Sequence, residues 1–251
     1  VVFHLGARSS TEERDADAIL RDNLQFSLSL WNWCAQSNAR FIYASSAATY
    51  GDGEAGFADD DSIKGLARLK PLNAYGWSKH AFDRRAARIA SRAGGSGSWS
   101  RPAAFGDLPI ESQRPRQWIG FKFFNVYGPN EDHKGGQRSV AVQLYEQIKA
   151  TGRARLFKSH RDGVADGGQK RDFIWVGDCV DALLWANDAP NISGVFNLGT
   201  GQARSFEDLA RAAFKAMNME PAIDYIDMPE SLRDRYQYFT EADMTRLRAA
   251  G

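Results

Sequence analysis

The sequence has little of what marks several large classes of protein. It holds two cysteines among 251 residues, Cys34 and Cys179, and their spacing suits neither a metal site nor a disulfide framework. It contains no run of eighteen apolar residues and no basic-then-apolar leader, so nothing in it marks a membrane span or a signal peptide. Its 32 Lys and Arg and 31 Asp and Glu form no block of one sign. We therefore expect a cytoplasmic protein with no nucleic-acid, membrane or metal partner.

Short apolar segments alternate with longer segments of helical periodicity along the chain. The first helix is predicted from about residue 10 to 36, because Ile19, Leu24 and Leu28 recur at a helical spacing and residues 10–13 fit a capping box. Further helices are predicted at 74–93, 177–188, 205–218 and 240–251. Strands are predicted at 1–5, 40–45, 118–124, 171–176, 194–199 and 222–226. This alternation predicts a doubly wound, Rossmann-like α/β fold with a parallel sheet.

The pattern also predicts two regions. Residues 1–130 are interpreted as the remaining part of a dinucleotide-binding domain, with a flexible insertion at 94–117 that is rich in Gly, Ser and Pro. Residues 131–251 are interpreted mostly as a smaller substrate-binding region, with 172–200 returning to the sheet and a mobile loop at 158–170. The chain opens inside a strand at Val1, and no glycine-rich phosphate turn follows a first strand. We therefore expect that N-terminal strands, with that turn, are missing from this chain.

A serine, a tyrosine and a lysine form the chemical core of the prediction. Tyr75 and Lys79 in "NAYGWSK" are four residues apart on a predicted helix, so they share one face. Ser45 and Ser46 end the preceding strand, where doubly wound sheets bind ligands. A serine that orients a substrate oxygen, a tyrosine that exchanges its proton and a lysine that lowers the pKa of the tyrosine suit hydride transfer at an alcohol. The tyrosine–lysine spacing alone is weak, and the strand-end serines give it weight.

Several motifs in order resemble the extended short-chain dehydrogenase/reductase family, of the NAD-dependent epimerase/dehydratase type. They are "HLGA", "YASSAATYG", "NAYGWSK" and "FKFFNVYGPNEDHKG". The stretches "KRDFIWVGD", "GVFNLGTGQARSF" and "RYQYFTEADMTRLRAAG" are most similar to the branch of ADP-heptose 6-epimerases. The resemblance implies a homo-oligomer that holds NADP, with NAD as the alternative. It also implies an ADP-sugar substrate, inverted at C6″ through a transient ketone in lipopolysaccharide core synthesis.

The resemblance implies roles for individual positions. Catalytic roles fall on Tyr75, Lys134, Ser46 and Lys79. Cofactor contacts fall on Gly6, Ala7, Ser9, Asn23, Lys79, Val126 and Lys134. Substrate contacts fall on Ser46, Asn125, Phe157, Arg171 and Tyr236. Inversion at a carbinol presents the oxygen differently on the two faces, so Tyr75 and Lys134 are expected to divide the acid–base work between them.

Two alternatives stay open. Another nucleotide-sugar epimerase or reductase would use the same serine, tyrosine and lysine. A chain without the phosphate turn could instead be a catalytically incomplete fragment that binds sugar nucleotides. Dehydration is disfavoured, because Ala47 and Ala48 follow Ser46 where an acid would be needed to protonate a leaving hydroxyl.

Overall fold

A parallel four-stranded sheet forms the larger part of the molecule. The computed structural model describes residues 1–251 except 12, 14, 94–113 and 234–235. The strands lie in the order β1-β2-β3-β7, with bounds β1 (Val2–His4), β2 (Phe41–Ser46), β3 (Trp118–Phe123) and β7 (Gly194–Leu198). All three pairings are parallel, and Ser46 pairs with Phe123 at the carboxyl end of β2. The predicted Rossmann-like α/β fold is confirmed.

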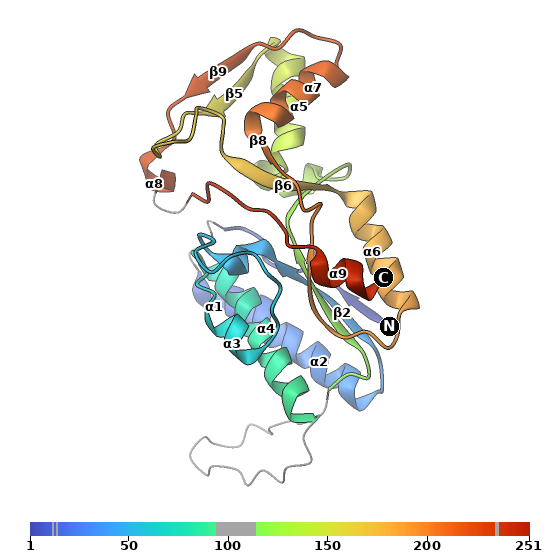
Figure 1. Ribbon diagram of the computed structural model, residues 1–251. Coiled ribbons are helices and arrows are strands. Elements are labelled where there is room, and N and C mark those ends of the chain that lie inside the picture. Colours follow the sequence, from blue (N-terminus) through green and yellow to red (C-terminus); the bar gives the residue numbers. More distant parts are fainter. Residues whose placement is uncertain (12, 14, 94–113, 234–235) are drawn as a thin grey trace.

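Helices cover both faces of this sheet (Figure 1). On one face, Phe41 and Tyr43 of β2 pack with Trp31 of α2 (Phe26–Gln36) and Phe82 of α4 (Ala74–Ala93). On the other face, Ile42 packs with residues of α6 (Val176–Asp188) and α9 (Thr245–Ala250). Side chains of a strand alternate between faces, so a strand buried on both sides is apolar throughout. That requirement explains the apolar run that predicted β2.

A smaller region is built from the later part of the chain and lies at one end of the sheet (Figure 1). Strand β6 (Lys170–Trp175) pairs in parallel with β4 (Asn125–Tyr127) and antiparallel with β8 (Ala203–Ser205). Strands β5 (Ala154–Phe157) and β9 (Ile223–Ile226) form a parallel pair. Helices α5 (Val140–Thr151) and α7 (Phe206–Ala216) pack on that pair around Leu144 and Phe214.

Several short helical segments connect the strands and the longer helices. Helix α1 (Ala16–Ile19) and the π-helical segment η1 (Leu20–Gln25) run directly into α2. The 3₁₀ turn η2 (Ala47–Tyr50) follows β2, and α3 (Ile63–Ala67) lies between η2 and α4. The remaining short elements are the 3₁₀ segment η3 (Asp132–Gln137) and α8 (Glu230–Arg233).

Two sequence expectations differ from the structure, two elements were missed, and one expectation lies largely outside the described residues. Asp15, whose side chain accepts from the amide of Ala18, caps the first helix, so the capping box predicted at 10–13 is wrong. The last helix begins only at Thr245. Helix α5 and strand β5 were not predicted. Residues 94–113 of the expected insertion lie outside the described residues, and its last residue, Gln117, is buried and donates to the carbonyls of Ala186 and Ala189.

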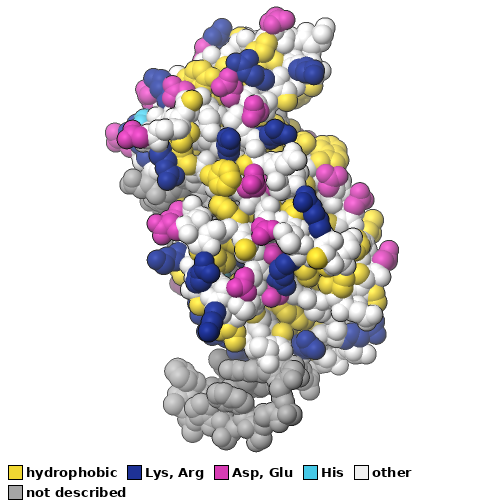
Figure 2. Space-filling model, in the orientation of Figure 1, with side chains coloured by type: hydrophobic (Ala, Val, Ile, Leu, Met, Phe, Trp, Pro, Cys, Tyr) yellow, Lys and Arg dark blue, Asp and Glu magenta, His cyan; other side chains and the backbone are white. Residues whose placement is uncertain are grey.

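The surface in view mixes charges of both signs. In Figure 2, Lys and Arg are interspersed with Asp and Glu over the described residues of that face, without a broad region of one sign. None of the helices within the described part of the chain is long and apolar enough to cross a membrane.

Candidate active site

Ser46 and Tyr75 meet at the carboxyl end of β2. Ser46 ends the strand and begins the turn η2, where its Oγ accepts from the amide of Ala48 at 3.1 Å. Tyr75 lies in the first turn of α4, which Asn73 caps by accepting from the amide of Gly76 at 2.8 Å. Burial raises the pKa of Tyr75, while a hydrogen bond with Ser46 acts in the opposite direction. The structure therefore joins the predicted serine to the predicted tyrosine.

Lys79 lies one turn further along α4 and is almost fully buried, with 5% of its surface exposed. Its Nζ donates to the carbonyl of Ala44 at 2.7 Å, two residues before Ser46. Burial lowers the pKa of Lys79 to about 8, and the nearby Asp83 opposes this shift. An ammonium thus stands beside the strand end at neutral pH, close to losing its proton.

The turn after β1 is held against α4 by Asn23. The Asn23 side chain accepts from the amide of Arg8 at 2.8 Å and donates to the Arg8 carbonyl and to Ser78 Oγ at 3.1 and 3.0 Å. Ser78 donates in turn to the carbonyl of Tyr75 at 2.7 Å. The predicted cofactor turn is thereby connected to the helix that carries the tyrosine.

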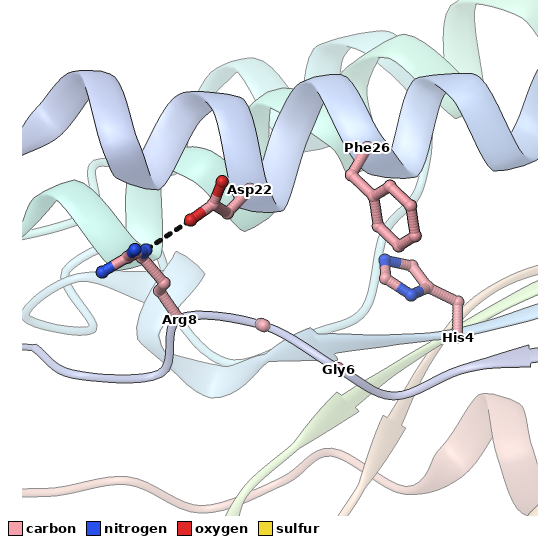
Figure 3. Close-up of a pocket in the computed structure, with 6 residues that line it drawn as sticks. His4, Gly6, Arg8, Asp22 and Phe26 are labelled. Carbon is pink, nitrogen blue, oxygen red and sulfur yellow. Dashed lines mark hydrogen bonds and ion pairs between the residues drawn. The ribbon is translucent and has the colours of Figure 1, made fainter.

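An open pocket of about 380 Å³ adjoins this turn (Figure 3). It is lined by the turn and by the facing helix, namely His4, Gly6, Ala7, Arg8, Asp22 and Phe26. The side chain of Arg8 is ion-paired with Asp22, and the rings of His4 and Phe26 meet edge to face at 5.4 Å. A Cβ added to Gly6 would meet nothing within 4 Å, so the backbone of the turn faces open space. The predicted residues Gly6 and Ala7 line the pocket, and the exposed Ser9 does not.

Within the described residues, no hydrogen bond or ion pair joins Lys134 to Ser46 or Tyr75. Lys134 belongs to η3, after β4, which carries the exposed Asn125 and the half-buried Val126. Its Nζ lies 3.7 Å from the carboxylate of the buried Glu131. Glu131 also accepts from the amide of Gly128 and from the amide and hydroxyl of Ser139, at 3.2, 2.7 and 2.7 Å. Glu131, which sequence reasoning missed, therefore holds the segment that carries Lys134.

A buried guanidinium marks the smaller region. Arg171 on β6 is 7% exposed and lies over the rings of Tyr236 and Phe206, at 5.2 and 5.6 Å. Tyr236 contacts Phe157 edge to face at 6.3 Å, so three predicted substrate residues come together here. Arg171 donates to the carbonyl of Lys170 at 2.9 Å and forms no ion pair with a carboxylate of the described residues. Burial accordingly lowers its pKa.

The carboxyl end of β2 thus carries a hydrogen-bonded serine and tyrosine with a buried lysine on the same helix, and the turn that lines the pocket is bonded to that helix. A Rossmann-like α/β domain with this arrangement defines a protein of the short-chain dehydrogenase/reductase class. The family described as the NAD dependent epimerase/dehydratase family matches residues 1–199. The chain belongs to this family, whose members are enzymes.

Sequence relatives of the chain include enzymes that share one name. An ADP-L-glycero-D-manno-heptose-6-epimerase of Nitratidesulfovibrio vulgaris is 51% identical over 250 residues, covering 100% of this chain and 70% of the relative. The enzyme of the same name from Fusobacterium nucleatum is 44% identical, with the same shares covered. The chain therefore spans about 70% of the length of these relatives.

Solved structures agree on the fold. The Helicobacter pylori ADP-L-glycero-D-manno-heptose-6-epimerase has a TM-score of 0.75 and 26% identity, covering 99% of this chain and 65% of that one. The Thermus thermophilus UDP-glucose 4-epimerase, solved in complex with NAD, has a TM-score of 0.72 and 22% identity, covering 99% and 70%. The second likeness is one of fold alone.

Proposed function

We propose that the protein inverts C6″ of an ADP-glycero-manno-heptose through a transient ketone, using a bound nicotinamide dinucleotide, in lipopolysaccharide core synthesis. The sequence relatives support the substrate, since two of them carry this activity in their names at 51% and 44% identity. Arg171 is the single structural observation that carries the proposal. A guanidinium with 7% exposure and no carboxylate partner among the described residues suits the diphosphate of a nucleotide sugar.

The turn after β1 suits a dinucleotide. Gly6 presents its backbone to open space, and Asn23 fixes the path of the turn through both backbone groups of Arg8. Gly6, Ala7, Ser9, Asn23 and Val126 would hold the cofactor together with Lys79. A bound nicotinamide would accept the hydride from C6″ and return it to the opposite face. We propose NADP, with NAD as the alternative.

The chain's own groups would move the proton. Ser46 would hold the C6″ oxygen, and Tyr75 would take the hydroxyl proton during oxidation. Tyr75 would enter this step as a phenolate and leave it as a phenol. Lys79 would stabilise the phenolate before the transfer, because its ammonium lies one helical turn away. Lys134, which comes from a separate segment, would donate the proton to the C6″ oxygen when hydride returns to the opposite face of the ketone. Asn125, Phe157 and Tyr236 would line the sugar-nucleotide site with Arg171.

The test is turnover of purified protein. ADP-D-glycero-D-manno-heptose is incubated with the chain and NADP, and inversion at C6″ is followed by proton NMR. Tyr75→Phe should abolish the reaction, and Arg171→Met should raise KM about tenfold or more with a smaller change in kcat. The proposal fails if the sugar is not inverted. Turnover of a UDP-sugar instead would favour another epimerase of the family, and ADP-sugar binding without turnover would favour an incomplete fragment.

The cofactor, assembly and location have their own measurements. Mass spectrometry of the small molecules released from purified protein distinguishes NADP from NAD. We propose a homo-oligomer, which light scattering after gel filtration would measure, and a cytoplasmic location, which cell fractionation would measure.

A further inference from the structure

A buried carboxylate lies directly behind the strand end that carries Ser46. Asp83 is on α4, four residues after Lys79, and has no exposed surface. Its two oxygens accept from Tyr43 Oη at 2.9 Å and from Ser45 Oγ at 2.7 Å. Lys122 Nζ lies 3.2 Å from the same carboxylate. Three donors from two neighbouring strands therefore converge on one side chain of the catalytic helix.

Lys122 extends this cluster to the turn beyond Ser46. It comes from the central strand β3 and is 1% exposed. Its Nζ donates to Thr49 Oγ1 at 2.6 Å and lies over the ring of Tyr50, 4.7 Å from the ring centre. Thr49 and Tyr50 belong to η2, the turn that Ser46 begins. The ion pair thus fixes the backbone on both sides of Ser46 relative to α4.

The pair also acts on the charges of the site. The Asp83 carboxylate raises the pKa of Lys79 against the opposing effect of burial, and it contributes to the raised pKa of Tyr75. Besides Tyr75 on the same helix, His4 on β1 faces Lys79, and its pKa is lowered to about 4 by burial and by the Lys79 charge. The His4 ring is therefore neutral at pH 7. Within the described part of the chain, Asp83 is then the charged group that favours the Lys79 ammonium.

Stability alone gives little reason to keep such a pair. Two ions buried in a protein lose their hydration, and replacing both by neutral groups of similar volume is often neutral or stabilising. The contacts of Asp83 and Lys122 fall on Ser45, Thr49 and Tyr50, which flank Ser46. We propose that the Asp83–Lys122 pair is the positioning element of the active site, which holds Ser46 in line with Tyr75 and fixes a carboxylate one helical turn from Lys79. Its catalytic consequence rests on the function proposed above.

The test removes both charges at once. Either single substitution would leave a buried ion without a partner and strongly destabilise the protein. In the double variant Asp83→Asn, Lys122→Met, the asparagine oxygen still accepts from Tyr43 or Ser45, and methionine keeps the length of the lysine stem. The double variant Asp224→Asn, Arg153→Met is the matched control, because it removes an exposed ion pair between β9 and the residue that directly precedes β5 in the smaller region.

The readout is the titration of Lys79, followed by NMR of protein labelled at lysine Cε and assigned from the spectrum of Lys79→Arg. We expect the midpoint to fall by about one pH unit in the Asp83/Lys122 variant, because Asp83 is the charge that raises the pKa of Lys79 and a nearby opposite charge commonly shifts a pKa by about 1–3 units. The control variant should titrate like the unsubstituted protein. At pH 7.5 the charged fraction of Lys79 would fall about threefold, from a midpoint of about 8. The kcat should fall by a similar factor, with little change in KM.

Each outcome decides the proposal. A folded double variant with a lowered Lys79 midpoint supports it. An unchanged midpoint overturns it, and so does failure of the double variant to fold, since the pair would then be needed for the structure itself. The titration requires no turnover, so a protein that does not invert ADP-heptose refutes the proposed function and leaves this result readable.

Discussion

Replacing Lys79 with methionine is expected to remove a pH dependence from the stability of the protein. The native pKa of Lys79 is about 8, against 10.5 for an ordinary lysine, because its ammonium is buried. Between these two values the unfolded state binds more protons than the native state, so the free energy of unfolding rises with pH. The destabilisation caused by the buried Lys79 ammonium is therefore at its maximum below pH 8, and it decreases as the pH rises from 8 towards 10.5.

The magnitude follows from the shift. A difference of 2.5 pKa units corresponds to about 3.4 kcal/mol at 1.36 kcal/mol per unit, so burial of the Lys79 charge costs about 3 kcal/mol at pH 7. By pH 9.5 the cost falls to about 1.4 kcal/mol, because most native molecules have already lost the proton. The unsubstituted protein should therefore gain about 2 kcal/mol relative to Lys79→Met between pH 7 and 9.5.

The assay is urea unfolding of both proteins at pH 7, 8, 9 and 9.5. Other groups titrate in this range, so the quantity that matters is the difference between the two proteins at each pH. Lys215→Met, which removes an exposed lysine from α7, controls for the loss of a lysine as such. A constant difference between Lys79→Met and the unsubstituted protein across the series would refute the reasoning. Lys79→Met should be inactive throughout.

Three further predictions rest on other residues. His80 is buried with no hydrogen-bond partner for either ring nitrogen among the described residues, and burial lowers its pKa to about 4. Between pH 6.5 and 4 the unfolded chain therefore binds a proton at His80 that the native protein does not, so the free energy of unfolding falls as the pH is lowered. His80→Leu should reduce this loss between pH 7 and 5 by about 2 kcal/mol, as measured by urea unfolding. Glu131→Gln should cost about 2 kcal/mol of stability by thermal unfolding and lower turnover, because it breaks the bonds that hold the segment of Lys134; unchanged turnover would contradict this role. Gly51→Ala should lower the melting temperature by several degrees, since Gly51 has φ of +66° and a Cβ would lie 1.9 Å from the carbonyl of Lys70.

The fold was predictable because its signals are local. The apolar strands, and helix α4 with its bounds at Ala74 and Ala93, follow from periodicity over a few residues. The start of the first helix was wrong because two capping sequences lie close together, and Asp15 rather than Ser10 begins the helix. Strand β5 was missed because its four residues, although alternately buried, are too few for a period of two to be recognised. Its partner β9 lies almost 70 residues later, so the pairing that stabilises it is invisible to local reasoning.

The candidate site likewise contains residues that local motifs predict and residues that only the packing of the fold brings together. Ser46, Tyr75 and Lys79 could be predicted as site residues because each lies on a short motif, while the contacts of Asp83 and Lys122 depend on how three elements pack. A signal was nevertheless present in the sequence. Lys122 is the one charge in the apolar run "WIGFKFF", and Asp83 shares a helix face with Lys79. A charge inside a strand that is buried on both faces needs an opposite charge from a covering helix. The chain supplies that partner on the helix that carries Tyr75, so the arrangement that makes the lysine tolerable in the core also fixes the geometry of the active site.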